Sequence, residues 1–141
     1  MNTDPSQESS PGAGAGDGDA YAFTVQVEPR YIPGESAPEQ GRHVFAYTIV
    51  VENVGEQAAR LMSRRWLITD GDGRKQEVQG PGVVGKQPRI PPGESFRYTS
   101  AAVLETAVGC MEGHYEFHAD DGAAFTVPIP AFTLAMPNAV H

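Results

Sequence analysis

The sequence predicts an all-β fold, an immunoglobulin-like or fibronectin type III-like sandwich of about seven antiparallel strands. Apolar and polar residues alternate from Tyr21 onward, which is the period of a β-strand. Pairs of turn-forming residues separate these segments at short intervals, and no segment has the period of an amphipathic helix. A tryptophan in a central segment, Trp66, is typical of the core of such a sandwich, although no cysteine pair accompanies it.

The first three expected strands each place a set of apolar residues on one face. These sets are Tyr21, Phe23, Val25 and Val27; then Phe45, Tyr47, Ile49 and Val51; then Met62, Trp66 and Ile68. A long loop from Pro29 to Arg42 is expected between the first two strands, after a brief extension of the first strand through Tyr31 and Ile32. Arg64 shares the apolar face of the third strand, so we expect it near the rim, where its stem packs and its guanidinium reaches water.

The segment Asp70–Gly73, two Asp-Gly pairs in succession, is the strongest turn signal in the chain. Glycine accepts the positive φ of a tight hairpin, so we expect the chain to reverse there into a strand over residues 75–79. A calcium loop needs further acidic ligands and a closing glutamate, and Arg74 and Lys75 follow instead. The turn interpretation is therefore preferred.

The second half of the chain continues the same pattern. Turns are expected at Pro91–Glu94, at Gly109–Gly113, which contains Cys110, and at Asp120–Gly122. Between the last two, Tyr115 and Phe117 face inward. Pro128 and Pro130 fall in the last strand, and because proline cannot donate to a ladder, that strand is expected to be bulged or at an edge.

Composition limits the range of functions. The chain has 141 residues and a net charge of -8, which disfavours binding to nucleic acid or to an anionic membrane surface. Residues 1–20 carry four acids and no base and are expected to be a disordered tail before one domain, residues 21–141. No segment approaches the roughly 20 apolar residues of a membrane helix. With no secretory signal and the single Cys110, we expect a soluble cytoplasmic protein.

Gly80, Gly82 and Gly85 have the spacing G-x-G-x-x-G of dinucleotide-binding folds. That fold needs a helix after the glycines, and prolines at 88, 91 and 92 exclude one. Two interpretations are left. Backbone amides of Gly80–Lys86, helped by Arg74, Lys75 or Arg89, could cradle a phosphate-rich ligand. Alternatively, the glycines serve a rigid turn that needs positive φ, and this interpretation is preferred.

His114, Glu116 and His118 form an outward-facing row and are the best metal candidates, for a divalent cation. Residues two apart on a strand lie about 6.5 Å from each other, within reach of one ion. The same alternation is ordinary for the solvent face of an antiparallel sheet. Cys110 and His114 provide no oriented nucleophile and base, so we expect a protein that is not an enzyme.

Several segments occur in an order that resembles a known family. They are Val44–Thr48, Arg64–Thr69, Glu77–Pro88, Pro92–Glu94, Tyr98–Ser100, Gly113–Tyr115 and Ile129–Leu134. From about Tyr21 to His141 the chain resembles the ApaG family, also called CorD, whose bacterial members are fibronectin type III-like sandwiches.

The resemblance implies a link to diadenosine tetraphosphate metabolism and to cobalt and magnesium tolerance. Related domains in eukaryotic F-box and polymerase-associated proteins imply a protein-interaction module. We therefore expect an unidentified protein partner, with a phosphate-rich small molecule or a divalent cation (cobalt or magnesium) as the alternative ligand. The protein itself is expected to be a monomer or a symmetric dimer.

Overall fold

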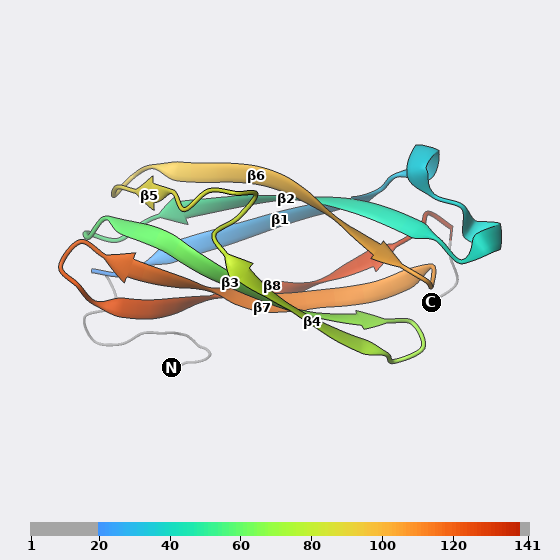
Figure 1. The fold of residues 1–141 in the computed structure, drawn as a ribbon. Coiled ribbons are helices and arrows are strands. Elements are labelled where there is room, and N and C mark those ends of the chain that lie inside the picture. Colours follow the sequence, from blue (N-terminus) through green and yellow to red (C-terminus); the bar gives the residue numbers. More distant parts are fainter. Residues whose placement is uncertain (1–19, 139–141) are drawn as a thin grey trace.

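The structure is a computed structural model, which describes residues 20–138, and it is a sandwich of two antiparallel sheets (Figure 1). The smaller sheet has the order β1-β2-β6, and its strands are β1 (Phe23–Tyr31), β2 (His43–Asn53) and β6 (Ser95–Leu104). Two short 3-10 turns, η1 (Pro33–Glu35) and η2 (Pro38–Gln40), lie between β1 and β2. The predicted fold class is confirmed.

The larger sheet has the order β4-β3-β7-β8, and β5 pairs with the start of β3. Its strands are β3 (Ala59–Asp70), β4 (Lys75–Pro81), β5 (Arg89–Ile90), β7 (Val108–Ala119) and β8 (Ala124–Ala135). The predicted hairpin turn joins β3 to β4, with Gly73 at a φ of 85°. The turn at Asp120–Gly122 likewise joins β7 to β8.

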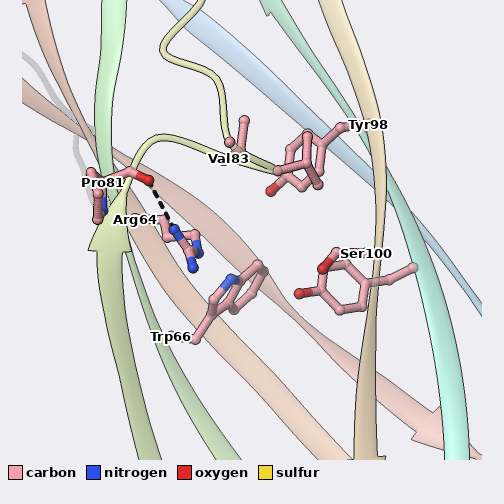
Figure 2. Close-up of a pocket in the computed structure, with 9 residues that line it drawn as sticks. Arg64, Trp66, Pro81, Val83, Tyr98 and Ser100 are labelled. Carbon is pink, nitrogen blue, oxygen red and sulfur yellow. Dashed lines mark hydrogen bonds between the residues drawn. The ribbon is translucent and has the colours of Figure 1, made fainter.

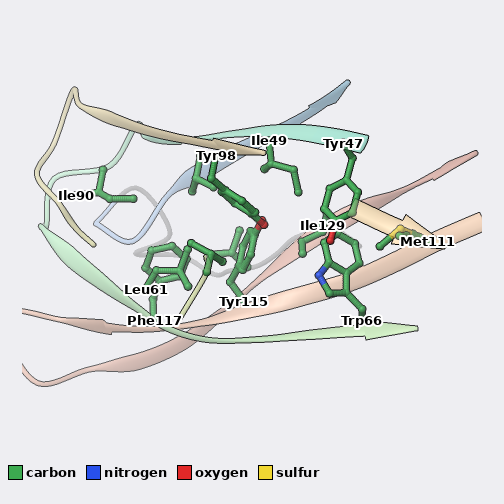
Figure 3. Close-up of a cluster of buried hydrophobic side chains, with 14 of the residues drawn as sticks. Tyr47, Ile49, Leu61, Trp66, Ile90, Tyr98, Met111, Tyr115, Phe117 and Ile129 are labelled. Atoms are coloured by element: carbon green, nitrogen blue, oxygen red, sulfur yellow. The ribbon is translucent and has the colours of Figure 1, made fainter. Parts of the chain in front are cut away.

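The core lies between the sheets and is rich in aromatic rings (Figure 3). It is built from the inward faces that the alternation predicts, including Phe45, Ile49, Trp66, Tyr115 and Phe117. Tyr47 of one sheet meets Trp66 of the other edge-on, with ring centroids 5.5 Å apart. Such contacts between the sheets fix how they pack and so where the site described below is formed.

The first strand continues past Pro29 to Tyr31, where a brief extension was expected, and this is possible because β1 is an edge strand. One expectation about strand limits is wrong. The expected turn at Gly109–Gly113 lies inside β7, and the chain turns at residues 105–107 instead. A Cβ on Gly113 would lie 2.0 Å from the Arg65 carbonyl oxygen, so this glycine serves a close backbone approach.

A β-bulge in β3 corrects another expectation. The register with β7 shifts between Leu61 and Ser63, so that one residue has no counterpart. Leu61 is fully buried, whereas Met62, which was expected on the inner face, is partly exposed. After the bulge, the even-numbered residues face inward as predicted, and Arg64 and Trp66 lie in the space between the sheets.

The two long sides of the sandwich are closed differently. On one side β1 packs against β8, an edge strand as predicted, with Pro128 and Pro130 exposed. On the other side the connection from β4 to β5 passes close to β6 (Figure 1). In the described part of the chain no helix is long and apolar enough to cross a membrane. The predicted disordered tail lies, apart from Ala20, outside the described residues.

Candidate functional site: a pocket beneath the glycine loop

The glycine loop, residues 80–86, is a tight hairpin held by its own backbone. The amide of Gly82 donates to the Met62 carbonyl oxygen at 2.8 Å, and Val83 and Lys86 exchange two hydrogen bonds of 2.8 and 2.9 Å. Val84 and Gly85 therefore occupy the tip, with φ angles of 43° and 79°. Positive φ at both central residues is what a type I′ turn requires.

Each glycine of the loop has its own geometric reason. A Cβ on Gly82, whose φ is 58°, would lie 2.1 Å from the Lys86 carbonyl oxygen. A Cβ on Gly80 would lie 2.8 Å from Nη1 of Arg64, which packs over it. Gly85 has open space around it and needs glycine only for its φ of 79°. The rigid-turn interpretation of the glycines is thus supported at Gly82 and Gly85.

Beneath the loop lies a cavity of about 250 Å³ between the two sheets (Figure 2). Arg64 and Trp66 of β3 form one wall, and side chains of β2 and β6 form the other. The lining residues are Tyr47, Arg64, Trp66, Pro81, Val83, Val84, Gly85, Tyr98 and Ser100. The pocket therefore depends on four separate segments of the chain, which only the assembled sandwich brings together.

Arg64 is the single charged side chain of this pocket. Its Nη1 donates to the carbonyl oxygens of Pro81 and Gly82 at 3.1 and 3.0 Å, so it anchors the glycine loop to β3. Within residues 20–138, no acidic side chain forms an ion pair with Arg64, and its Nε and Nη2 have no hydrogen-bond partner. The guanidinium thus has unused donors in a partly buried place.

The hydroxyl groups of the pocket are neutral at physiological pH. Burial raises the pKa of Tyr47, while the Ser100 hydroxyl and the charge of Arg64 act in the opposite direction. Burial likewise raises the pKa of Tyr98, whose hydroxyl lies 2.5 Å from that of Tyr115 (Figure 3). The walls therefore offer hydrogen-bonding groups and aromatic faces around one positive charge.

The sequence-predicted ligand residues of the loop only partly meet this pocket. Gly85 lines it, whereas Gly80, Gly82 and Lys86 do not. Two of the three bases expected to help an anion are paired elsewhere: Arg74 with Asp70, Asp72 and Glu105, and Arg89 with Asp120. The third, Lys75, donates to the Thr69 hydroxyl at 3.5 Å and does not line the pocket. The amides of Gly82, Val83 and Lys86 donate to backbone carbonyls, whereas those of Val84 and Gly85 have no acceptor among the described residues. A phosphate site in this loop stays a prediction.

The histidine row lies on the outer face of β7, as its alternation predicts. Glu116 and His118 are exposed, and His114 is partly exposed. His114 and Glu116 border a shallow hollow of about 430 Å³ together with Arg65 and Gln79. In the part of the chain that the structure describes, no three His, Cys, Asp or Glu side chains converge to hold a metal ion. Metal binding by this row also stays a prediction.

Fold and site together define a class: a small two-sheet β-sandwich whose glycine loop covers a pocket with a single charged side chain. The family model of the ApaG domain matches residues 33–119 of this chain. The chain belongs to the ApaG family, as its sequence resemblance predicts.

Named relatives agree over nearly their whole length. The chain is 56% identical over 121 residues to Protein ApaG of Azoarcus sp. strain BH72, which covers 86% of this chain and 95% of the relative. Protein ApaG of Pseudomonas aeruginosa strain LESB58 is 57% identical, with coverages of 86% and 96%. A crystal structure from Bordetella pertussis, described as an ApaA protein, superposes with a TM-score of 0.83 at 50% identity, covering 86% of this chain and 98% of that one.

Proposed function

We propose that this ApaG-family chain is a non-enzymatic binding module, and that a protein partner docks where the glycine loop covers the pocket. The observation that carries the proposal is Val84, at the tip of the loop. Its side chain is 50% exposed and its φ is 43°. A β-branched residue at positive φ is a backbone outlier, and the left-handed region costs such a residue about 1–2 kcal/mol.

The strain at Val84 has no structural benefit within the fold, because asparagine or glycine would make the same turn without it. Strained residues cluster at ligand-binding positions, where the surrounding structure holds them. Val84 presents an apolar side chain to solvent beside the mouth of the pocket. This arrangement suits a contact in which a partner covers the loop tip and reaches the pocket behind it.

The lining of the pocket supports binding rather than catalysis. It contains no His, Cys, Asp, Glu or Lys, and its tyrosine hydroxyls are held protonated by burial. Ser100 has no base beside it in the lining that could activate its hydroxyl. We place the module in the cytoplasm, since the free Cys110 suits a reducing compartment.

Two alternatives that the family resemblance implies have less support. They are a phosphate-rich ligand at the glycine loop, related to diadenosine tetraphosphate metabolism, and a divalent cation at His114, Glu116 and His118, related to cobalt and magnesium tolerance. Three loop amides are already bonded within the protein, and the histidine row has no converging ligand among the described residues. Protein docking is therefore the function that the contacts favour.

The test is a quantitative affinity isolation with the wild-type protein, Val84→Asn and Val54→Asn. Val54 is exposed to 53% and also lies beside a turn, so Val54→Asn is a matched control for a lost surface valine. We expect a partner recovered equally by the wild type and Val54→Asn, and about ten-fold less by Val84→Asn, as for an interface hot spot. Equal recovery by all three, or no partner specific to the protein, would overturn the proposal.

A further inference from the structure

We propose that the pocket beneath the glycine loop receives the carboxylate of an acidic side chain, aspartate or glutamate, presented by the partner. The inference rests on the proposed function, because it names the group that the docked partner inserts behind Val84. Three observations support it: two nitrogens of Arg64 have no acceptor, Arg64 is the single charge of the pocket, and three loop amides are already bonded to carbonyl oxygens.

The unused edge of Arg64 has the geometry that carboxylates bind. Nη1 is occupied by the carbonyl oxygens of Pro81 and Gly82, which leaves Nε and Nη2. These two nitrogens form the side-on fork that matches the two oxygens of a carboxylate. The same protein shows this mode at Arg89, whose Nε and Nη2 each donate to one carboxylate oxygen of Asp120.

The charge of the pocket favours a monoanion. Arg64 is partly buried and has no acidic partner in residues 20–138, and a charge removed from water is stabilised by a partner of opposite sign. The rest of the lining is neutral, and Lys86 is not part of it. One carboxylate balances one guanidinium, whereas a pyrophosphate would bring surplus negative charge into a confined space.

The loop backbone gives a chain terminus or a phosphate few free amides to bind. Proteins that capture C-terminal carboxylates and phosphates commonly use nests of free backbone amides. Here the amides of Gly82, Val83 and Lys86 are bonded to carbonyl oxygens, which leaves only the tip amides of Val84 and Gly85 without an acceptor among the described residues. The full positive charge of the pocket comes from the Arg64 side chain, which suits an acidic side chain reaching in from a partner.

The shape of the pocket fits one side chain. Its volume of about 250 Å³ is below the roughly 300–1,000 Å³ of sites for drug-sized ligands. In Figure 2 the guanidinium of Arg64, the indole of Trp66 and the hydroxyl of Ser100 border one space, with Val83 and Tyr98 above it. The apolar walls can hold the methylene stem while the carboxylate meets Arg64.

Trp66 gives a direct readout, because it is the single tryptophan of the chain and it lines the pocket. The purified full chain is titrated with the capped peptide acetyl-Gly-Glu-Gly-amide, its Asp counterpart, and its uncharged Gln counterpart. Further arms are acetyl-Gly-Gly-Gly with a free C-terminus and inorganic pyrophosphate. For fragments of this size we expect a dissociation constant on the order of 1–10 mM for the Glu or Asp peptide. The Gln peptide should bind at least about ten-fold more weakly.

Two variants test whether the fluorescence change of Trp66 depends on the guanidinium of Arg64. Arg64→Gln should remove the saturable fluorescence change, and Arg65→Gln should retain it. Arg65 is the next residue along β3, but it faces outward and pairs with Glu77 at 3.0 Å. Where Arg64→Gln does not fold, the comparison of peptides on the wild-type protein still decides the question.

Several outcomes would overturn the inference. They are equal binding of the Glu and Gln peptides, tighter binding of the free C-terminus or of pyrophosphate, and no saturable change up to about 50 mM peptide. Any of them leaves the affinity isolation with Val84→Asn unaffected, so the docking proposal can survive alone. Conversely, a carboxylate-selective pocket with no loss of partner in Val84→Asn would refute docking at the loop tip and keep only an anion site.

Discussion

Gly82→Ala and Gly85→Ala separate the two reasons for which the loop needs glycine. Both residues have positive φ, 58° and 79°, so alanine at either position costs about 1–2 kcal/mol of left-handed strain. The stiffer unfolded chain returns about 0.4–1 kcal/mol of that. Gly85 has open space around it, so Gly85→Ala should lower the free energy of unfolding by only about 0.5–1.5 kcal/mol.

Gly82→Ala adds a clash with the backbone, because its Cβ would lie 2.1 Å from the Lys86 carbonyl oxygen. That oxygen accepts the hydrogen bond of Val83, a fully buried residue. Losing this bond and displacing Val83 should bring the total to about 3 kcal/mol or more.

Urea unfolding followed by Trp66 fluorescence measures both variants, and an unchanged slope with urea confirms that the two-state comparison holds. The reasoning fails if the two variants lose equal stability, or if Gly82→Ala is the milder of the two. Either result would mean that the close approach of Gly82 to Lys86 does not exist in the folded protein.

Three further predictions follow from particular contacts. Val84→Asn should raise the free energy of unfolding by about 0.5–1 kcal/mol by relieving strain, while Val54→Asn should change it by less than about 0.5, both read from urea midpoints. Tyr98→Phe should cost about 1–3 kcal/mol, because it leaves the buried Tyr115 hydroxyl without its partner, and the double variant Tyr98→Phe/Tyr115→Phe should recover most of this in a double-mutant cycle. The hydrogen bond and charge of Arg89 hold the pKa of Asp120 below its usual value. This pair therefore stabilises the fold above about pH 4, and its contribution is lost as the pH falls through the lowered pKa. Asp120→Asn should make the free energy of unfolding, measured with urea, depend less on pH on the acid side.

The sequence predicts the sandwich well because alternation and turn residues are local signals. Phe45, Tyr115 and Phe117 are buried as their period requires. The errors arise where glycine has a non-local purpose. Gly113 is a residue type that favours turns, yet here its missing Cβ makes room for the Arg65 carbonyl oxygen of the neighbouring strand. No local sequence pattern predicts this contact between two strands.

The pocket was beyond sequence reasoning for a related reason. Arg64 on the apolar face of its strand was a correct local signal, and the expectation of a place near the rim agrees with its position. What the sequence lacks is the bulge after Leu61, which puts Leu61 instead of Met62 on the inner face, and the packing that places Tyr98 and Ser100 opposite Arg64 and Trp66. The glycine spacing drew attention to Gly80–Lys86, whereas the charged side chain that faces the cavity comes from β3.

Site-specific photo-crosslinking in cells tests the docking of a partner at the loop tip most directly. A photoreactive phenylalanine is placed in turn at Val84, Val54 and Val103, which are exposed to 50, 53 and 51% and so differ in place rather than in accessibility. We expect one discrete, larger protein adduct from position 84 and none of that size from positions 54 and 103. The same adducts from all three positions, or an adduct from position 54 or 103 alone, would contradict it.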